Sequence, residues 1–238
     1  MKDEALSLIK TYRICVPVKA EDVHSAIKMI MEAEELMVDF IEVRMDYMKN
    51  IGNLSDITGS TRIPLIATFR PKRQGGLFDG RDEERIKVLE KSINAGFEYV
   101  DLELDTSVLD KTVEDFKNMG VKLIISHHDF NRTPTTLELR WLLSRELSYE
   151  PDICKLVTYA NHLEDNLICL KFLSRFSRNV KLVCFAMGKL GLISRILSPL
   201  YGGFFTFASL KKGLETAPGQ LTVEELRTIV KVMEAVGF

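Results

Sequence analysis

The chain has 238 residues, of which 46% are hydrophobic and 28% charged, and its formal net charge is −2. These values are typical of a globular protein and exclude a disordered or collagen-like chain. At roughly 150 residues per domain, the length fits either one large domain or two small ones. The balanced charge and a sequence pI of about 6.1 argue against a nucleic-acid partner and favour a small molecule.

Eight short runs rich in β-branched and aromatic residues are predicted to be strands. They cover residues 14–18, 40–46, 65–70, 99–104, 123–130, 153–157, 182–187 and 204–209. Their starts are 22 to 34 residues apart. Each interval is long enough for the crossover helix that parallel strands require.

The segments between these runs mostly carry apolar residues at helical spacing. This pattern predicts helices over 22–36, 86–97 and 163–170. A last helix begins at Thr222, because Glu225 three residues later completes a capping box and Leu221 can pack against Leu226 as a hydrophobic staple.

Eight strand and helix units in this length match the α/β class and the (β/α)8 TIM barrel, whose typical length is about 250 residues. We therefore predict a single-domain barrel over residues 1–238. A doubly wound open sheet is the alternative, because the number of units does not prove that the sheet closes.

Charged residues alternate with apolar ones on several of the predicted strands. Since helices cover the outside of a barrel, the charged sets should point inward or lie at the mouth. They are Glu42, Arg44 and Asp46 on the second run, Arg70 on the third, Asp101, Glu103 and Asp105 on the fourth, and Lys155 on the sixth. These residues could form structural ion pairs, such as Glu42 with Arg44 and Asp101 or Glu103 with Lys155. Together with the fifth run, whose polar end is described next, five neighbouring strands carry polar residues, and we favour a polar cavity for a small anion rich in hydroxyls.

The fifth run ends in adjacent histidines, His127 and His128. Neighbours on a strand face opposite sides, which argues against a shared metal ion. If His128 shares the inward face with Ser126, it lies beside Lys155 on the next strand, about 4.8 Å away if the registers match. A histidine beside an inward lysine suits a proton carrier next to a Schiff-base nucleophile.

Two loops in the last third are candidates for binding an anion. Residues 187–195 follow the seventh strand, carry two glycines and end in Arg195, which can clamp a carboxylate. Residues 216–220 follow the eighth strand and bring Thr216 and Gln220 to the mouth. Anion sites gather after strands seven and eight of such barrels.

The cysteines and the apolar runs indicate the cellular compartment. The four cysteines form no C-x-x-C pair, so we expect reduced core residues. The apolar stretch Ala5–Ile9 is too short for a signal-peptide core, and no run reaches the roughly 18 residues of a membrane span. We expect a cytoplasmic protein that binds neither membrane nor nucleic acid.

The chain resembles type I 3-dehydroquinate dehydratases over nearly its whole length. The matching stretches are Ile41–Asp46, Thr68–Arg70, Asp101–Glu103, Ser126–Phe130 with Thr133-Pro134, Asp152–Lys155, Ile193–Arg195 and Ala217–Gln220. Any one of them could arise by chance. Together, in this order, they are highly specific.

The resemblance implies dehydration of 3-dehydroquinate to 3-dehydroshikimate in the shikimate pathway, without metal or organic cofactor. By motif, Lys155 would form an imine with the substrate ketone and His128 would act as general base and acid. Arg195, Thr216 and Gln220 would hold the substrate carboxylate. The ring hydroxyls would be held by Glu42, Arg44 and Arg70. An apolar surrounding with inward arginines would favour the neutral amine of Lys155.

Two positions depart from the family pattern. Gln74 stands where a glutamate is usual; it could hold the His128 ring by a hydrogen bond but could not stabilise an imidazolium by charge. Thr216 stands where a serine is usual and keeps the hydroxyl. For Asp101 and Glu103 a supporting role beside Lys155 is at least as well founded as a direct one.

Two other functions remain open at this point. One is a Schiff-base aldolase of the same architecture, which would favour a phosphate site over a carboxylate clamp. The other is a catalytically impaired binding relative, for which Gln74 is the only indication. A homodimer is expected by resemblance. Glycines in the segment 73–77 would permit it to close as a lid.

Overall fold

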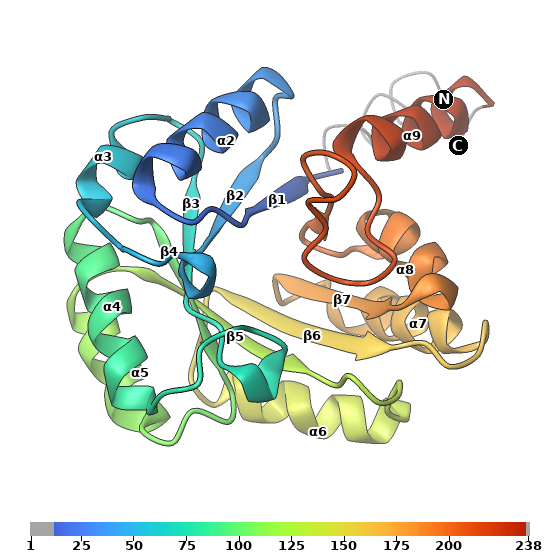
Figure 1. Ribbon diagram of the computed structural model, residues 1–238. Helices are drawn as coiled ribbons and strands as arrows, with labels where there is room; N and C mark the ends of the chain where they lie inside the picture. The colour runs from blue at the N-terminus through green and yellow to red at the C-terminus, as the bar shows by residue number, and fades with distance from the viewer. Residues whose placement is uncertain (1–11, 237–238) are drawn as a thin grey trace.

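The computed structural model describes residues 12–236 and shows eight parallel strands surrounded by helices (Figure 1). The strands are β1 Ile14–Val18, β2 Phe40–Arg44, β3 Leu65–Thr68, β4 Tyr99–Glu103, β5 Lys122–His128, β6 Ile153–Tyr159, β7 Leu182–Met187 and β8 Thr206–Phe207. The stretch Ala5–Ile9, on which the signal-peptide argument rests, lies outside the described residues.

One helix follows each strand. The helices are α2 Val23–Glu35, α3 Leu54–Thr58, α4 Asp82–Asn94, α5 Leu109–Asn118, α6 Thr136–Leu147, α7 Asp165–Phe176, α8 Leu192–Leu197 and α9 Val223–Ala235. Short 3-10 helices η1 Met45–Tyr47, η2 Lys72–Gln74, η3 Lys189–Gly191 and η4 Ser198–Tyr201 lie in the loops. Within residues 12–236, no helix is long and apolar enough to cross a membrane.

The strands pair in chain order without reversal, from β1 to β7, and β8 lies on the other side of β1. The backbone N–H of Phe204 donates to the carbonyl of Leu182 at 2.8 Å, which links the segment before β8 to the start of β7. The sheet is therefore a nearly closed barrel. This confirms the predicted fold class and excludes the doubly wound alternative.

Helix ends follow the local sequence. At α9 the Thr222 hydroxyl accepts from the Glu225 N–H and the Glu225 carboxylate accepts from the Thr222 N–H, so the predicted capping box is confirmed. A second box, Thr135 with Glu138, starts α6 and was not predicted, although it has the same sequence pattern.

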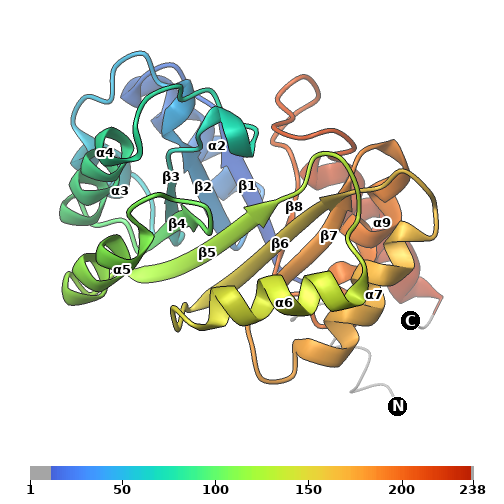
Figure 2. The same cartoon turned by 90° about the horizontal axis from the view of Figure 1, so that it is seen from below.

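The core has two parts, one on each side of the sheet. The larger part lies between strands and helices and contains the outward set that includes Ile41, Val43 and Val100. Figure 2 shows α6 and α7 along the outside of β5, β6 and β7. The smaller part fills the barrel interior, where Phe40, Tyr99 and their neighbours form an apolar floor. All four cysteines are free and buried, as expected.

Candidate active site

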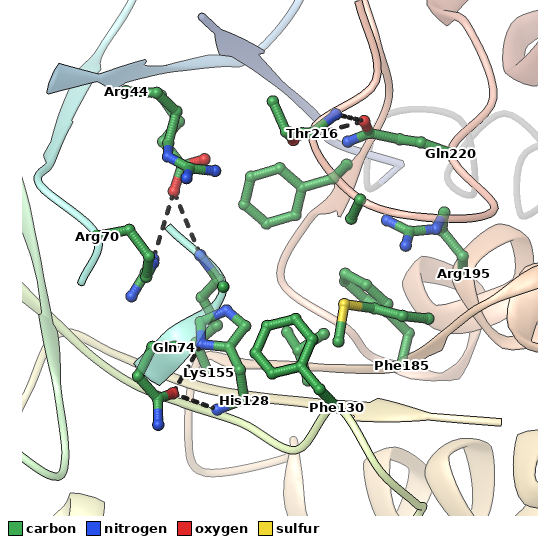
Figure 3. Close-up of a pocket in the computed structure, with 16 residues that line it drawn as sticks. Arg44, Arg70, Gln74, His128, Phe130, Lys155, Phe185, Arg195, Thr216 and Gln220 are labelled. Carbon is green, nitrogen blue, oxygen red and sulfur yellow. Dashed lines mark hydrogen bonds and ion pairs between the residues drawn. The ribbon is translucent and has the colours of Figure 1, made fainter. Parts of the chain in front are cut away.

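A pocket of about 480 Å³, including its open mouth, lies at the carboxyl ends of the strands (Figure 3). Nine of the residues singled out in the sequence line it: Glu42, Arg44, Arg70, Gln74, His128, Lys155, Arg195, Thr216 and Gln220. Asp101 and Glu103 do not line it and lie fully buried beside it. The interior is thus polar above an apolar floor.

Lys155 points into the pocket from β6 and is 3% exposed. Its Nζ donates to Asp101 at 2.8 Å and to Glu42 at 3.3 Å, and it lies 4.6 Å from the centre of the Phe207 ring. The nearest charges are therefore carboxylates, and the expectation that arginines would surround the amine is wrong.

Asp101 is the centre of the buried ion pairs below the pocket. It accepts a hydrogen bond from Arg70 at 2.8 Å and forms a second ion-pair contact with the same guanidinium, also at 2.8 Å. It also accepts from the Ser126 hydroxyl at 2.6 Å, besides the bond from Lys155. Burial alone would raise the pKa of this carboxyl, but the charges of Arg70 and Lys155 outweigh it and hold the pKa well below its usual range. Arg70 also donates to Glu103 at 2.6 Å.

The ion pair suggested between Glu42 and Arg44 does not form. The Arg44 guanidinium makes a bidentate contact with Asp46, at 2.8 and 2.7 Å. The chain turns into η1 directly after β2, and this brings Asp46 back toward Arg44. Asp46 also accepts from the backbone N–H of Leu77 at 3.1 Å, so it fixes the segment after β3.

His128 ends β5 and is partly exposed. The strand register places His128 opposite Val157, and Ser126 opposite Lys155. The registers therefore do not match in the way that would put His128 directly beside Lys155; the two residues are offset by two positions. Both still line the same pocket, because His128 follows Ser126 on the inward face. Burial, together with the charges of Arg70 and Lys155, lowers the pKa of the imidazole well below its usual value, so His128 is neutral at neutral pH.

Arg195 faces these groups from α8, on the far side of the pocket in Figure 3. It is 2% exposed, stacks over the Phe185 ring at 4.4 Å and has no carboxylate partner among residues 12–236. Its Nη2 donates a weak hydrogen bond to the Pro218 carbonyl at 3.5 Å. Its Nε has no hydrogen-bond partner within the described chain. Burial lowers its pKa to about 10. A buried guanidinium in this state provides a site for an anion.

Thr216 and Gln220 lie in the loop after β8, on the same side of the pocket as Arg195 (Figure 3). The Gln220 side-chain oxygen accepts from the Thr216 backbone N–H at 2.9 Å, and this bond links the two ends of the segment 216–220. Both residues line the pocket.

Part of the pocket lining is apolar, and it was not predicted from the sequence. The apolar lining residues are Phe130, Val157, Phe185, Met187 and Phe207. The signal was present in the alternation of β6 to β8, where the inward positions that continue the Lys155 phase are aliphatic or aromatic. Phe207 lies beside Lys155 and Phe185 beside Arg195, so a ligand meets apolar surface next to the charged groups.

Comparison with known proteins places the chain in one family. The family model for type I 3-dehydroquinase matches residues 14–236. A 3-dehydroquinate dehydratase of Methanococcus maripaludis strain C5 is 36% identical over 226 residues, which cover 93% of this chain and all of the relative. One from Methanocaldococcus jannaschii is 34% identical over 223 residues, covering 93% of this chain and 99% of the relative.

Solved structures agree with this result. The type I 3-dehydroquinate dehydratase of Clostridium difficile superposes with a TM-score of 0.83 at 27% identity, over 94% of this chain and 93% of the other. The enzyme from Geobacillus kaustophilus gives the same TM-score at 26% identity, over 95% and 93%. The sequence resemblance is confirmed, and the chain belongs to the type I 3-dehydroquinase family.

Proposed function

We propose that this chain is a hydro-lyase that dehydrates 3-dehydroquinate to 3-dehydroshikimate in the shikimate pathway. One observation carries the proposal beyond family membership: a buried lysine and a neutral histidine from adjacent strands share a pocket with an arginine that has no carboxylate partner in the described chain. The substrate supplies the ketone for the first, the acidic C–H for the second and the carboxylate for the third.

The reaction begins when Lys155 attacks the C3 ketone. One proton must leave the Lys155 nitrogen before it attacks, and His128 can take it because the neutral ring has a free lone pair. His128 then returns this proton to the oxygen that departs as water, so the ring is neutral again before the next step. The amine adds to the carbonyl carbon and water leaves, which gives a protonated imine that acidifies the neighbouring C2–H. The solved C. difficile relative contains covalently modified comenic acid, which supports covalent chemistry in this family.

Elimination then removes water across C1 and C2. His128 takes the C2 proton, and the electron pair moves to the imine nitrogen to give an enamine. The enamine expels the C1 hydroxyl, which takes the proton from His128 and leaves as water. A second water hydrolyses the product imine, releases the ketone and regenerates the Lys155 amine. Side chains and water suffice for every step.

Binding roles follow from charge and position. We assign the substrate carboxylate to Arg195, with the Thr216 hydroxyl and the Gln220 amide beside it, because an anion there satisfies the buried guanidinium. Glu42 and Arg44 would hold the ring hydroxyls. Arg70 already contacts Asp101 and Glu103, and we propose that it acts chiefly by holding Asp101 against Lys155.

Borohydride reduction in the presence of 3-dehydroquinate tests the proposal. We expect a substrate-derived adduct on Lys155 by mass analysis, and none in Lys155→Ala. The matched control is Lys189→Ala, because Lys189 is an exposed lysine in the loop after β7, next to the segment that carries Arg195. Absence of both adduct and dehydration in the unmodified protein would refute the function.

We extend three further expectations to this chain as proposals. Residues 1–238 form one catalytic domain, the protein acts in the cytoplasm, and it assembles as a homodimer. Light scattering on the purified protein tests the last of these, and a mass equal to one chain would refute it.

A further inference from the structure

The side chain of Gln74 lies between the His128 ring and a carboxylate outside the pocket. Its oxygen accepts from the His128 backbone N–H at 2.9 Å and lies 3.3 Å from the ring Nδ1 (Figure 3). Its nitrogen donates to Asp105 at 3.0 Å. Asp105 follows β4, is 39% exposed at its side chain and does not line the pocket.

Two fixed partners determine which way the Gln74 amide points. A backbone N–H can only donate, so the atom that faces His128 must be the amide oxygen. A carboxylate can only accept, so the atom that faces Asp105 must be the amide nitrogen. Both requirements are met by the same orientation. A flipped amide would break two hydrogen bonds at once.

The orientation of this amide determines the tautomer of His128. The Gln74 oxygen has no hydrogen, so Nδ1 of the ring must carry one to bond to it. Nε2 then holds the lone pair. Nε2 is therefore the atom that can remove a proton from the substrate.

We propose that Asp105 is a positioning residue for His128, acting through Gln74 to keep the ring in the Nδ1–H tautomer. This inference rests on the proposed function, in which His128 carries the proton. Asp105 reaches the reaction only through two hydrogen bonds in series, so its loss weakens proton transfer and leaves substrate binding unchanged.

The pairing also accounts for the identity of residue 74. A glutamate there would place its second oxygen about where the Gln74 nitrogen now lies, 3.0 Å from the Asp105 carboxylate. Two carboxylates at that distance repel each other or share a proton. Glutamine at 74 and aspartate at 105 therefore form a matched donor and acceptor pair.

The first test replaces Asp105. We expect Asp105→Ala to lower kcat roughly two- to tenfold, the worth of one hydrogen bond, with KM unchanged. Asp105→Asn keeps an oxygen that can accept from Gln74 and should retain kcat within about twofold. Asp79→Ala is the control, because Asp79 is an exposed carboxylate that pairs with Lys72 at the same segment, and it should match the unmodified protein.

Nitrogen-15 NMR of the histidine ring gives a readout that does not depend on turnover. The resting protein should show His128 as the Nδ1–H tautomer alone, and Asp105→Ala should show a mixture. A single Nδ1–H tautomer with full kcat in Asp105→Ala would overturn the proposal. An equal loss in Asp105→Ala and Asp105→Asn, with KM raised, would overturn it too, because the contact of Asp105 with Arg73 would then be the cause.

The second test reverses the pair. At about pH 8, Gln74→Glu alone should lose kcat, because two carboxylates then face each other. Gln74→Glu combined with Asp105→Asn should recover it, because the amide introduced at position 105 can donate to the carboxylate introduced at position 74. Equal kcat in the single and double variants would refute the matched pair. If the unmodified protein does not dehydrate 3-dehydroquinate, the proposed function fails. If it does, and these variants behave alike, only this inference fails.

Discussion

Replacing Asp101 with asparagine tests the buried ion pairs directly. The change keeps the size of the side chain but removes the charge that holds Arg70 and Lys155 at 2.8 Å. Breaking one partner out of a buried pair costs about 3–5 kcal/mol. In Asp101→Asn, Arg70 still pairs with Glu103 and Lys155 still pairs with Glu42. We therefore expect a loss of unfolding free energy at the lower end of this range, about 3 kcal/mol.

For a protein of this length, each kcal/mol shifts Tm by about 2–4 °C, so Asp101→Asn should melt roughly 6–12 °C below the unmodified protein. Scanning calorimetry at neutral pH measures this. Asp79→Asn is the control, because its exposed pair with Lys72 should contribute less than about 1 kcal/mol.

The pH dependence of this difference has a defined sign. The pKa of Asp101 is held well below its usual value, so its contribution is present above the unfolded value of about 3.9 and is lost as pH falls below it. The gap between the two proteins should therefore be full at neutral pH and narrow below about pH 4. A Tm of Asp101→Asn within about 2 °C of the unmodified protein would refute this account of the charges.

Three more outcomes are expected. Arg195→Met should weaken substrate binding by about 10- to 100-fold, measured as a rise in KM. The Tm of the protein without substrate should be unchanged or higher, because the lost cation has no carboxylate partner among residues 12–236. An unchanged KM would contradict the anion site. Glu146 in α6 is fully buried, and burial raises its pKa well above the usual value, so the free energy of unfolding should fall as pH rises above about 4.3. Glu146→Gln should remove that slope in urea melts; parallel slopes in the two proteins would contradict it. Because the pKa of His128 is lowered, kcat/KM should stay level as pH falls through about 6.5 and drop only at lower pH. An inflection above that value would contradict a neutral base at this position.

The inward charges were predictable because every strand of a barrel is covered by helices on one side. Period-two alternation then assigns Glu42 and Lys155 to the interior, and the structure places both in the pocket. The same argument predicts the fold, since the spacing of the runs fixes the number of crossover helices. Neither inference needs information about distant partners.

Register and ion partners could not be predicted in this way. The offset between β5 and β6 depends on the stagger that closes the whole barrel, so no local pattern tells that Val157 rather than Lys155 lies opposite His128. The choice of Asp46 by Arg44 depends on a 3-10 turn after β2, where alternation ends. The apolar lining residues were missed for a different reason: inward aliphatic residues are ordinary in barrels and do not by themselves indicate a site.

The short strand β8 also determines the stage of folding at which the inward ion pairs begin to stabilise the protein. β8 has only two residues in the ladder and pairs with β1, so the barrel closes through contacts between opposite ends of the described chain. Such distant contacts form late in folding. Until then the charges on β2 to β6 face water, where ion pairs contribute little. A nascent chain that lacks its final segment therefore already contains these charged residues, but it has no dry interior in which their ion pairs would contribute to stability.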